Sequence, residues 1–364
     1  MENSTNNSIK WKQMASLIAL YASVIIGWIA YHRYQPALLE TFDLKEYAPL
    51  LIWAQAIILV ITPPIAGKLG DRYRDKLGNR LRIITLGVSF AAMIFMTVAF
   101  TLLINPPKLF VFYALPVLVV LWLFAMSLFT SPAISMVELF SPSKQLPITV
   151  AALTITSDLL YSLEPVIVDI IDYLGGALTF ATGGIIVSLS GYFLNKYSLN
   201  TFKGTAENRP DEKKPESKLG VVLVIGAAIG LVSGIVIEIF PEYLNVLKDT
   251  VGIEGKWLVS ILLVITAIFS VPASRFVTGK NLGNQLLIFL LLAGAALSGV
   301  FLINNKIVMI GLLVAFAVFY AFINVCSLPL ALKNTSIQNK VLGVGVFFCG
   351  FEIPNGLIDI MMIN

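Results

Sequence analysis

Long apolar runs constrain this chain more than any other feature. A helix needs about 20 apolar residues to cross the hydrocarbon core of a bilayer. Eleven such runs occur in the 364 residues, at 14–35, 47–66, 83–104, 109–131, 147–171, 174–195, 219–240, 257–273, 286–303, 307–331 and 341–363. They are too long for barrel strands, which would also alternate polar and apolar residues. The sequence therefore predicts an all-α polytopic membrane protein.

Charged residues are too few to cover a water-facing surface. They make up 13% of the chain, whereas a soluble domain carries about a quarter. A soluble enzyme and a nucleic-acid-binding protein are therefore excluded. One histidine and two cysteines in apolar runs, Cys326 and Cys349, predict no metal site, no cofactor and no disulfide framework.

One long polar segment divides the chain. Residues 196–218 include Asn208-Arg209-Pro210-Asp211-Glu212-Lys213-Lys214-Pro215, a composition typical of a flexible linker. Six apolar runs precede it, in 1–195, and five follow it, in 219–364. Leu77-Gly78-Asn79 and Leu282-Gly283-Asn284 are separated by 205 positions, as are Pro36 and Pro241, which favours an internal duplication.

Basic residues predict the orientation. With the N-terminus in the cytoplasm and alternating runs, 19 of the 25 lysines and arginines lie on the cytoplasmic side. The predicted location is the cytoplasmic membrane of a bacterium. The basic loops are also suited to bind anionic lipid heads, which is compatible with the same topology.

The loop between the second and third runs carries the sharpest motif, at residues 63–80. Gly67 and Gly70 permit close approach of another helix, and Asp71 is suited to cap a helix N-terminus. Gly67, Leu69, Asp71 and Arg72 resemble the G-x-L-x-D-R signature of the major facilitator superfamily. Arg74 departs from the commonest version, which has glycine there.

A branch of that family is also suggested. The positions of Lys76, Gly78 and Arg80 after Asp71-Arg72, together with Trp53 and Pro63-Pro64 before it, resemble the glycoside–pentoside–hexuronide and sucrose transporter branch. The resemblance implies two six-helix bundles that rock about a central site. It implies a cytoplasmic latch formed by Gly67, Asp71, Arg72, Lys76, Gly78 and Arg80.

The family would supply twelve spans, and the sequence supplies eleven. We therefore expect a C-terminal bundle of five spans that lacks the twelfth helix. The alternative is that two spans are merged in one of the runs.

Ionisable residues within the apolar runs are candidates for proton coupling, because a charge at the bilayer centre costs at least about 2.5 kcal/mol. Run 147–171 holds two of them, Asp158 near its middle and Glu164, which share a polar arc with Thr154 and Tyr161. The alternative is an interhelical hydrogen bond. Glu352 is a further candidate, because Glu352, Asn355 and Asp359 fall on one helix face.

Two charged residues near the outer ends of runs 1 and 7, Arg33 and Glu238, are related by the 205-residue offset. We expect them to pair when the outer gate is closed. The alternative is that each extends to water independently.

Aromatic and amide side chains predict a polar uncharged solute such as a sugar or glycoside, since rings stack on sugar faces and amides bind hydroxyl groups. An aromatic belt at the membrane interface is the alternative. The substrate-lining candidates are Tyr21, Trp28, Tyr31, Gln35, Thr154, Tyr161, Tyr320, Asn324 and Asn355.

Together these features predict a monomeric secondary active transporter that works by alternating access, with a small solute and protons as its partners. No nucleic-acid partner and no enzymatic activity are expected, because no catalytic motif with supporting partners is present. A proton-driven drug or metabolite exporter, and a non-transporting receptor or scaffold, stay open.

Overall fold

The regular elements are all helical. The structure, a computed structural model, describes residues 8–42, 44–104, 107–202, 216–277 and 281–362. The α-helices are α1 (Trp11–Thr41), α2 (Ala48–Leu77), α3 (Leu81–Ile104), α4 (Lys108–Ile134), α5 (Val137–Phe140), α6 (Leu146–Ser162), α7 (Glu164–Phe202), α8 (Leu219–Gly234), α9 (Phe240–Tyr243), α10 (Lys248–Val251), α11 (Gly255–Phe276), α12 (Leu282–Leu302), α13 (Lys306–Lys333) and α14 (Lys340–Met362). Short turns of tighter or wider helix lie at η1 (Lys45–Tyr47), η2 (Ser143–Gln145), η3 (Ile235–Ile239), η4 (Leu244–Leu247) and η5 (Ile337–Asn339).

The prediction of a polytopic helical membrane protein is confirmed. Among the described residues, ten helical segments are long and apolar enough to cross a membrane. The 17-residue α6 is an eleventh bundle helix, and its helical hydrogen bonding resumes after Leu163, whose carbonyl accepts from the Ile167 N–H. The chain then breaks within α7 at Gly175, whose φ of +75° suits glycine because it has no Cβ.

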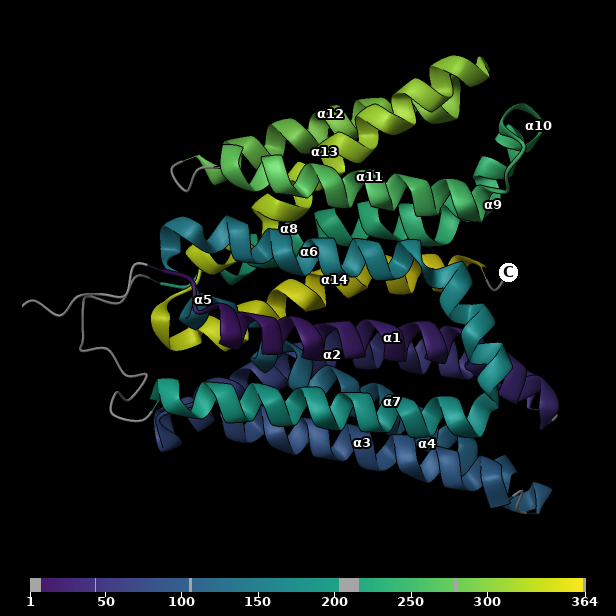
Figure 1. Ribbon diagram of the computed structural model, residues 1–364, viewed down its shortest axis with the longest axis vertical. Coiled ribbons are helices and arrows are strands. Elements are labelled where there is room, and N and C mark those ends of the chain that lie inside the picture. Colours follow the sequence, from purple (N-terminus) through teal and green to yellow (C-terminus); the bar gives the residue numbers. More distant parts are fainter. Residues whose placement is uncertain (1–7, 43, 105–106, 203–215, 278–280, 363–364) are drawn as a thin grey trace, which may run out of the picture.

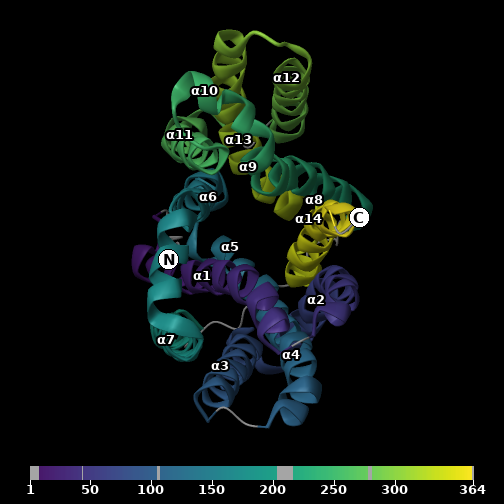
Figure 2. The ribbon, with the colours of Figure 1, turned by 90° about the vertical axis from the view of Figure 1, so that its right-hand side faces the viewer.

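The helices run roughly antiparallel along one axis (Figure 1). We call the end that holds α5, the α2–α3 turn and the first turn of α14 the loop end, and the opposite end the mouth end. α1–α7 form the N-terminal half, and α8–α14 form the C-terminal half. The halves meet where α2 packs along α14 and where α6 packs along α11, as Figure 2 shows from the mouth end.

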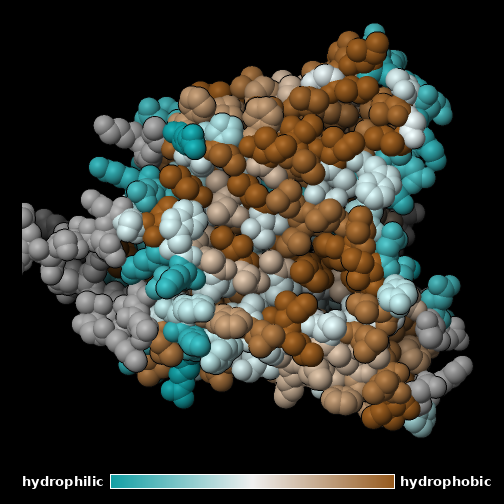
Figure 3. Space-filling model, viewed as in Figure 1, coloured by the Kyte–Doolittle hydropathy of each residue, from teal (hydrophilic) through white to brown (hydrophobic). Residues whose placement is uncertain are grey.

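The surface is apolar around the middle of the bundle. Large hydrophobic side chains in the middle of helices, such as Ile268 of α11 and Leu291 of α12, are mostly exposed, at 61% and 66%. The face in Figure 3 is hydrophobic across its centre and hydrophilic at both ends. This distribution fits a belt that faces lipid tails, with polar side chains at the two water-facing ends.

Glycines allow α14 to pack tightly between α2 and α8. A Cβ at Gly226 or Gly230 of α8 would meet the backbone of Phe347 or Phe351 in α14, and a Cβ at Gly350 would meet Leu223. On the opposite side, a Cβ at Gly345 would meet the backbone of Pro63 in α2. Small residues at such contacts let membrane helices approach closely.

A turn of π-helix interrupts the seventh span at η3. Pro241 follows directly and has no N–H to donate into an α-helical ladder. The wider turn accommodates that proline, and π-helical turns occur frequently at functional sites. This turn carries Glu238.

Candidate functional site

A central cavity lies between the two halves. It has a volume of about 670 Å³ and is lined by residues of α1, α2, α4, α6, α7, α8, α11, α13 and α14, with further contributions from η3 and α9. This volume falls within the range of about 300–1,000 Å³ typical of small-molecule sites. The cavity reaches the mouth end, where its lining includes His32, Asp169 and Lys256.

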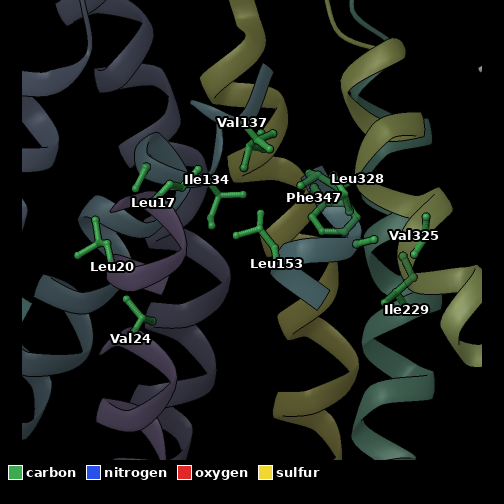
Figure 4. Packing of buried hydrophobic residues seen from close by; sticks show 14 of the residues in the cluster. Leu17, Leu20, Val24, Ile134, Val137, Leu153, Ile229, Val325, Leu328 and Phe347 are labelled. Carbon is green, nitrogen blue, oxygen red and sulfur yellow. The ribbon is translucent and has the colours of Figure 1, made fainter. Parts of the chain in front are cut away.

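Apolar side chains close the cavity toward the loop end. Ile134 and Leu153 from the N-terminal half lie beside Leu328 and Phe347 from the C-terminal half (Figure 4). All four line the cavity and are buried. We call these four residues the floor. Since the floor joins the two halves, a path to the loop end requires them to separate.

Asp158 is the most enclosed carboxylate of the cavity. Its side chain lies on α6, and the residue is only 5% exposed. Its Oδ2 atom has no hydrogen-bond partner among the described residues. Thr154, Tyr161 and Glu164 of the predicted arc also line the cavity. The helix-period pattern therefore places four predicted residues on one wall.

The second half of α14 contributes further polar groups. Glu352, Asn355 and Asp359 all line the cavity, whereas Cys349 is not among its lining residues. Asp359 accepts a hydrogen bond from Gln55 Nε2 at 3.2 Å, and Tyr31 donates its hydroxyl to Gln55 Oε1 at 2.9 Å. This network connects α1, α2 and α14 across the two halves.

Gln55 was not predicted as a site residue. It is the single amide in a strongly apolar stretch of α2, and it is 6% exposed. That isolation was a usable signal, because buried polar groups are almost always hydrogen-bonded. Its partner in the other half could not be inferred from the sequence.

The predicted aromatic and amide candidates separate into two groups. Tyr21, Trp28, Tyr320 and Asn324 line the cavity. Tyr31 and Gln35 are not among its lining residues. Tyr31 instead stacks on Trp122, with ring centroids 4.7 Å apart and planes 8° from parallel. Tyr31 contacts the cavity wall through its hydrogen bond to Gln55, which is a lining residue.

Acidic groups outnumber basic groups in the cavity. The lining carboxylates are Asp158, Glu164, Asp169, Glu238, Glu352 and Asp359. The lining basic groups are His32 and Lys256. The lining tyrosines Tyr21, Tyr161 and Tyr320 complete the titratable groups.

At the loop end, the predicted latch motif connects α2 to the start of α14. Both carboxylate oxygens of Asp71 accept backbone N–H groups of α14, from Val341 at 3.2 Å and from Leu342 at 2.9 Å. A carboxylate at a helix N-terminus also interacts favourably with the helix dipole. Gly67 and Gly70 lie against Val341, where a Cβ would be too close.

Arg74, the departure from the family signature, is part of this contact. It pairs with Asp71 at 3.1 Å and donates to the carbonyls of Ile337 and Gln338, each at 2.7 Å. The predicted Arg72 and Lys76 side chains are instead exposed. Sequence reasoning noted Arg74 only as a mismatch and missed this role. Gly78 ends α2 with a φ of +74°.

Arg80 anchors the α2–α3 turn to the rest of the N-terminal half. It is 1% exposed, donates to the Ser135 carbonyl and hydroxyl oxygens, and lies 3.6 Å from Glu138. Burial lowers the pKa of Arg80 to about 10, so the group stays charged at neutral pH. Glu138 also lies 3.6 Å from Lys340 of α14, which adds a second ionic contact between the halves.

The predicted gate residues do not contact each other in this structure. Arg33 forms two hydrogen bonds with Asp172, both 2.8 Å long, on the exposed mouth end. Glu238 lines the cavity instead. Because the cavity is open at this end, the pair expected for a closed gate stays a prediction.

A helical membrane protein with two halves around a central cavity, open at one end and closed at the other, has the architecture of a solute carrier. The chain belongs to the Major Facilitator Superfamily, whose family model matches residues 50–353. It is therefore a secondary transporter and not an enzyme. No curated protein sequence matches the chain.

Solved structures share the fold at low sequence identity. The human organic anion transporter MFSD10 (TETRAN) is 10% identical, with a TM-score of 0.66, and the match covers 97% of this chain and 92% of that one. A bacterial homologue of the iron transporter ferroportin in an outward-facing state is 14% identical, with a TM-score of 0.66 over 96% and 91%. A bacterial homologue of the human lysosomal transporter Spinster, inward-facing, is 16% identical, with a TM-score of 0.52 over 98% and 82%.

Proposed function

We propose that this transporter moves a small polar organic solute in exchange or together with protons, by alternating access of the central cavity. One observation carries the proposal: the buried carboxylate of Asp158, whose Oδ2 atom has no hydrogen-bond partner among the described residues, lines a solute-sized cavity between the halves. Ionisable side chains inside membrane proteins frequently mark proton pathways.

Two sets of contacts that close the cavity at the loop end support alternating access. The floor closes the cavity with apolar contacts, and Asp71 with Arg74 holds α14 against α2. Separation of these contacts would open the cavity to the loop end. We therefore assign Gly67, Asp71, Arg74 and Arg80 to a latch that stabilises the mouth-open state.

The orientation and the domain division follow the sequence argument. We propose that the loop end, with its basic turn from Lys68 to Arg82, faces the cytoplasm of a bacterium. Residues 1–195 and 219–364 act as the two moving halves, and 196–218 joins them. The protein works as a monomer, since each half supplies walls of the same cavity.

The walls favour small solutes that combine an apolar body with polar groups. Trp28 and Tyr320 suit a ring, and Asn324 and Asn355 suit hydroxyl groups, as the predicted sugar or glycoside requires. The excess of carboxylates favours a second candidate, a proton-driven drug or metabolite exporter. It disfavours an organic anion, the substrate named for the similar human transporter.

A solute panel in proteoliposomes with an imposed pH gradient tests the proposal. We expect saturable, gradient-dependent flux in the wild type, with loss of the gradient dependence in Asp158→Asn and Glu352→Gln. Asp249→Asn is the matched control, because Asp249 is exposed on α10 and is not among the cavity-lining residues. Flux unaffected by the gradient and by both substitutions would disprove proton coupling. The absence of saturable flux would favour a receptor or scaffold.

A further inference from the structure

The electrostatics of the cavity are one-sided. Six carboxylates line it, and its one lysine, Lys256, is already engaged at the rim. Lys256 Nζ lies 3.4 Å from Glu254 Oε2, and Lys248 donates to Glu254 Oε1 at 3.3 Å. These two lysines hold the pKa of Glu254 below its usual range. Little positive charge therefore remains to balance the carboxylates inside.

Unpartnered acceptors in the cavity point to a ligand that donates hydrogen bonds. Asp158 Oδ2, Asn355 Oδ1 and Ser131 Oγ are buried, line the cavity and have no hydrogen-bond partner among the described residues. A buried acceptor left without a donor costs about 1–3 kcal/mol. A bound ammonium group would supply both donors and the missing positive charge.

Aromatic rings from both halves line the same cavity as the Asp158 carboxylate. They include Tyr21 of α1 and Tyr320 of α13. Trp28 lines the cavity two turns further along the same face of α1. Aromatic faces attract cations, and Trp and Tyr are among the best for this purpose. A cavity that holds both these rings and a carboxylate is therefore suited to an organic cation.

The ligand groups are wrong for a metal ion. Among the described residues, no three His, Cys, Asp or Glu side chains come close enough together to hold one. The carboxylates are distributed along α6, α7, η3 and α14, and apolar walls such as Ile25 and Phe351 lie between them. The cavity thus favours a cation with an apolar body.

We propose that the cavity binds a monovalent organic ammonium ion with Asp158 as its counter-ion, and that this cation and a proton replace each other on the Asp158 carboxylate. One proton leaves as one cation binds, so the charge in the membrane interior does not change. The other lining carboxylates raise the local concentration of cations at the mouth end. This inference rests on the proposed function only in taking the cavity as the transport site.

Equilibrium binding to the purified full chain tests the inference without any gradient. The probes are phenethylammonium, its neutral counterpart 2-phenylethanol, tetraphenylphosphonium and methyl β-glucoside. We expect phenethylammonium to bind more tightly than either neutral probe. Tetraphenylphosphonium, which has no N–H donor, measures how much of that affinity the charge alone supplies. In weakly buffered solution about one proton should be released per cation, and affinity should rise by up to about tenfold per pH unit.

Substitutions at Asp158 separate the specific role from a loss of fold. Asp158→Asn should weaken cation binding at least tenfold and abolish proton release, whereas Asp158→Glu and Asp249→Asn should keep both. Unfolding temperatures establish that each variant is folded. The inference is overturned if phenethylammonium does not bind at millimolar concentration, if a neutral probe binds more tightly, or if Asp158→Asn releases protons as the wild type does. Gradient-driven glycoside uptake in that case would leave the proposed function standing.

Discussion

At the scale of single residues, the Tyr31–Gln55–Asp359 network joins the two halves near the mouth end. The Gln55 amide oxygen accepts from the Tyr31 hydroxyl, and its amide nitrogen donates to the Asp359 carboxylate. Removal of the Gln55 side chain therefore leaves both groups without this partner. We expect Gln55→Ala to lower the free energy of unfolding by about 1–3 kcal/mol. Thermal unfolding measures the change, and Gln35→Ala on α1 is the control.

A double-mutant cycle tests whether this network acts as a unit. Tyr31→Phe and Gln55→Ala should be non-additive, with a coupling of at least about 0.5 kcal/mol, because both remove the same hydrogen bond. Additive effects would show that the two side chains stabilise the protein independently.

The gate pair is a second question at this scale. Arg33 pairs with Asp172 in the open state, where both side chains are more than 40% exposed, so solvent screens this ion pair and it contributes little to stability. If Arg33 meets Glu238 in the closed state, single charge reversals at either position should reduce uptake. The double reversal should restore part of it. An uptake assay without any rescue would contradict the closed-gate pair.

Single residues also show what sequence can and cannot predict. Asp158 was identifiable because a carboxylate inside an apolar run is conspicuous. Gln55 and Arg74 were missed as site residues, because their importance depends on partners in the other half, Asp359 and the Ile337 and Gln338 carbonyls. Tyr31 was placed in the cavity lining by its helix face, but its ring turns to stack on Trp122.

At the scale of helices, we propose that the contact between Asp71 and α14 helps to set which end of the cavity is open. Asparagine at position 71 keeps the size but offers one acceptor oxygen and no charge to the two N–H groups. We expect Asp71→Asn to weaken the mouth-open state by about 1–3 kcal/mol, a shift of up to roughly 150-fold.

Labelling of a single cysteine measures that shift. Ser327 lines the cavity, so Ser327→Cys in a chain freed of Cys326 and Cys349 reports access by an impermeant thiol reagent. Asp71→Asn should increase labelling from the loop end. Asp249→Asn, whose exposed side chain lies on α10 away from the latch, should not. Equal labelling in both variants would show that Asp71 does not hold the latch.

Helix packing offers a matched pair of glycines on α8. Gly230 lies against the Phe351 backbone of α14, whereas a Cβ at Gly220 has open space. Gly230→Ala should therefore destabilise the protein by about 1–3 kcal/mol, the usual effect of overpacking. Gly220→Ala should leave the unfolding temperature nearly unchanged. A comparable loss in both variants would mean that the α8–α14 approach is not tight.

The spans themselves followed from the sequence because each has a local cause. Runs of apolar residues specify membrane helices because the lipid core holds no water. Every backbone N–H and C=O group there must be hydrogen-bonded within the helix. The π-helical turn η3 and the unusual φ at Gly175 were not predicted. Pro241 and Gly175 permit these distortions, but packing against neighbouring helices decides where they occur.

At the scale of the whole molecule, the two halves make one cavity that neither could make alone. Asp158 comes from the N-terminal half, and Glu352 comes from the C-terminal half. The 205-residue offset and the loop motif predicted this arrangement at the level of the family. They could not predict the balance of charge in the cavity, which depends on the side chains that six or more helices bring together.

Solute-induced proton movement tests the coupling of solute and proton at Asp158 most directly. A pH-sensitive dye trapped in proteoliposomes would record the internal pH when phenethylammonium, or the best solute of the panel, is added outside without an imposed gradient. The change seen in protein-free liposomes, where the neutral amine enters by diffusion and takes up a proton, is subtracted. We predict a pH change in the wild type and in Asp249→Asn, and no pH change in Asp158→Asn. The Asp158→Asn result counts only if that variant is folded and still binds or exchanges solute. An equal pH change in Asp158→Asn would contradict this coupling.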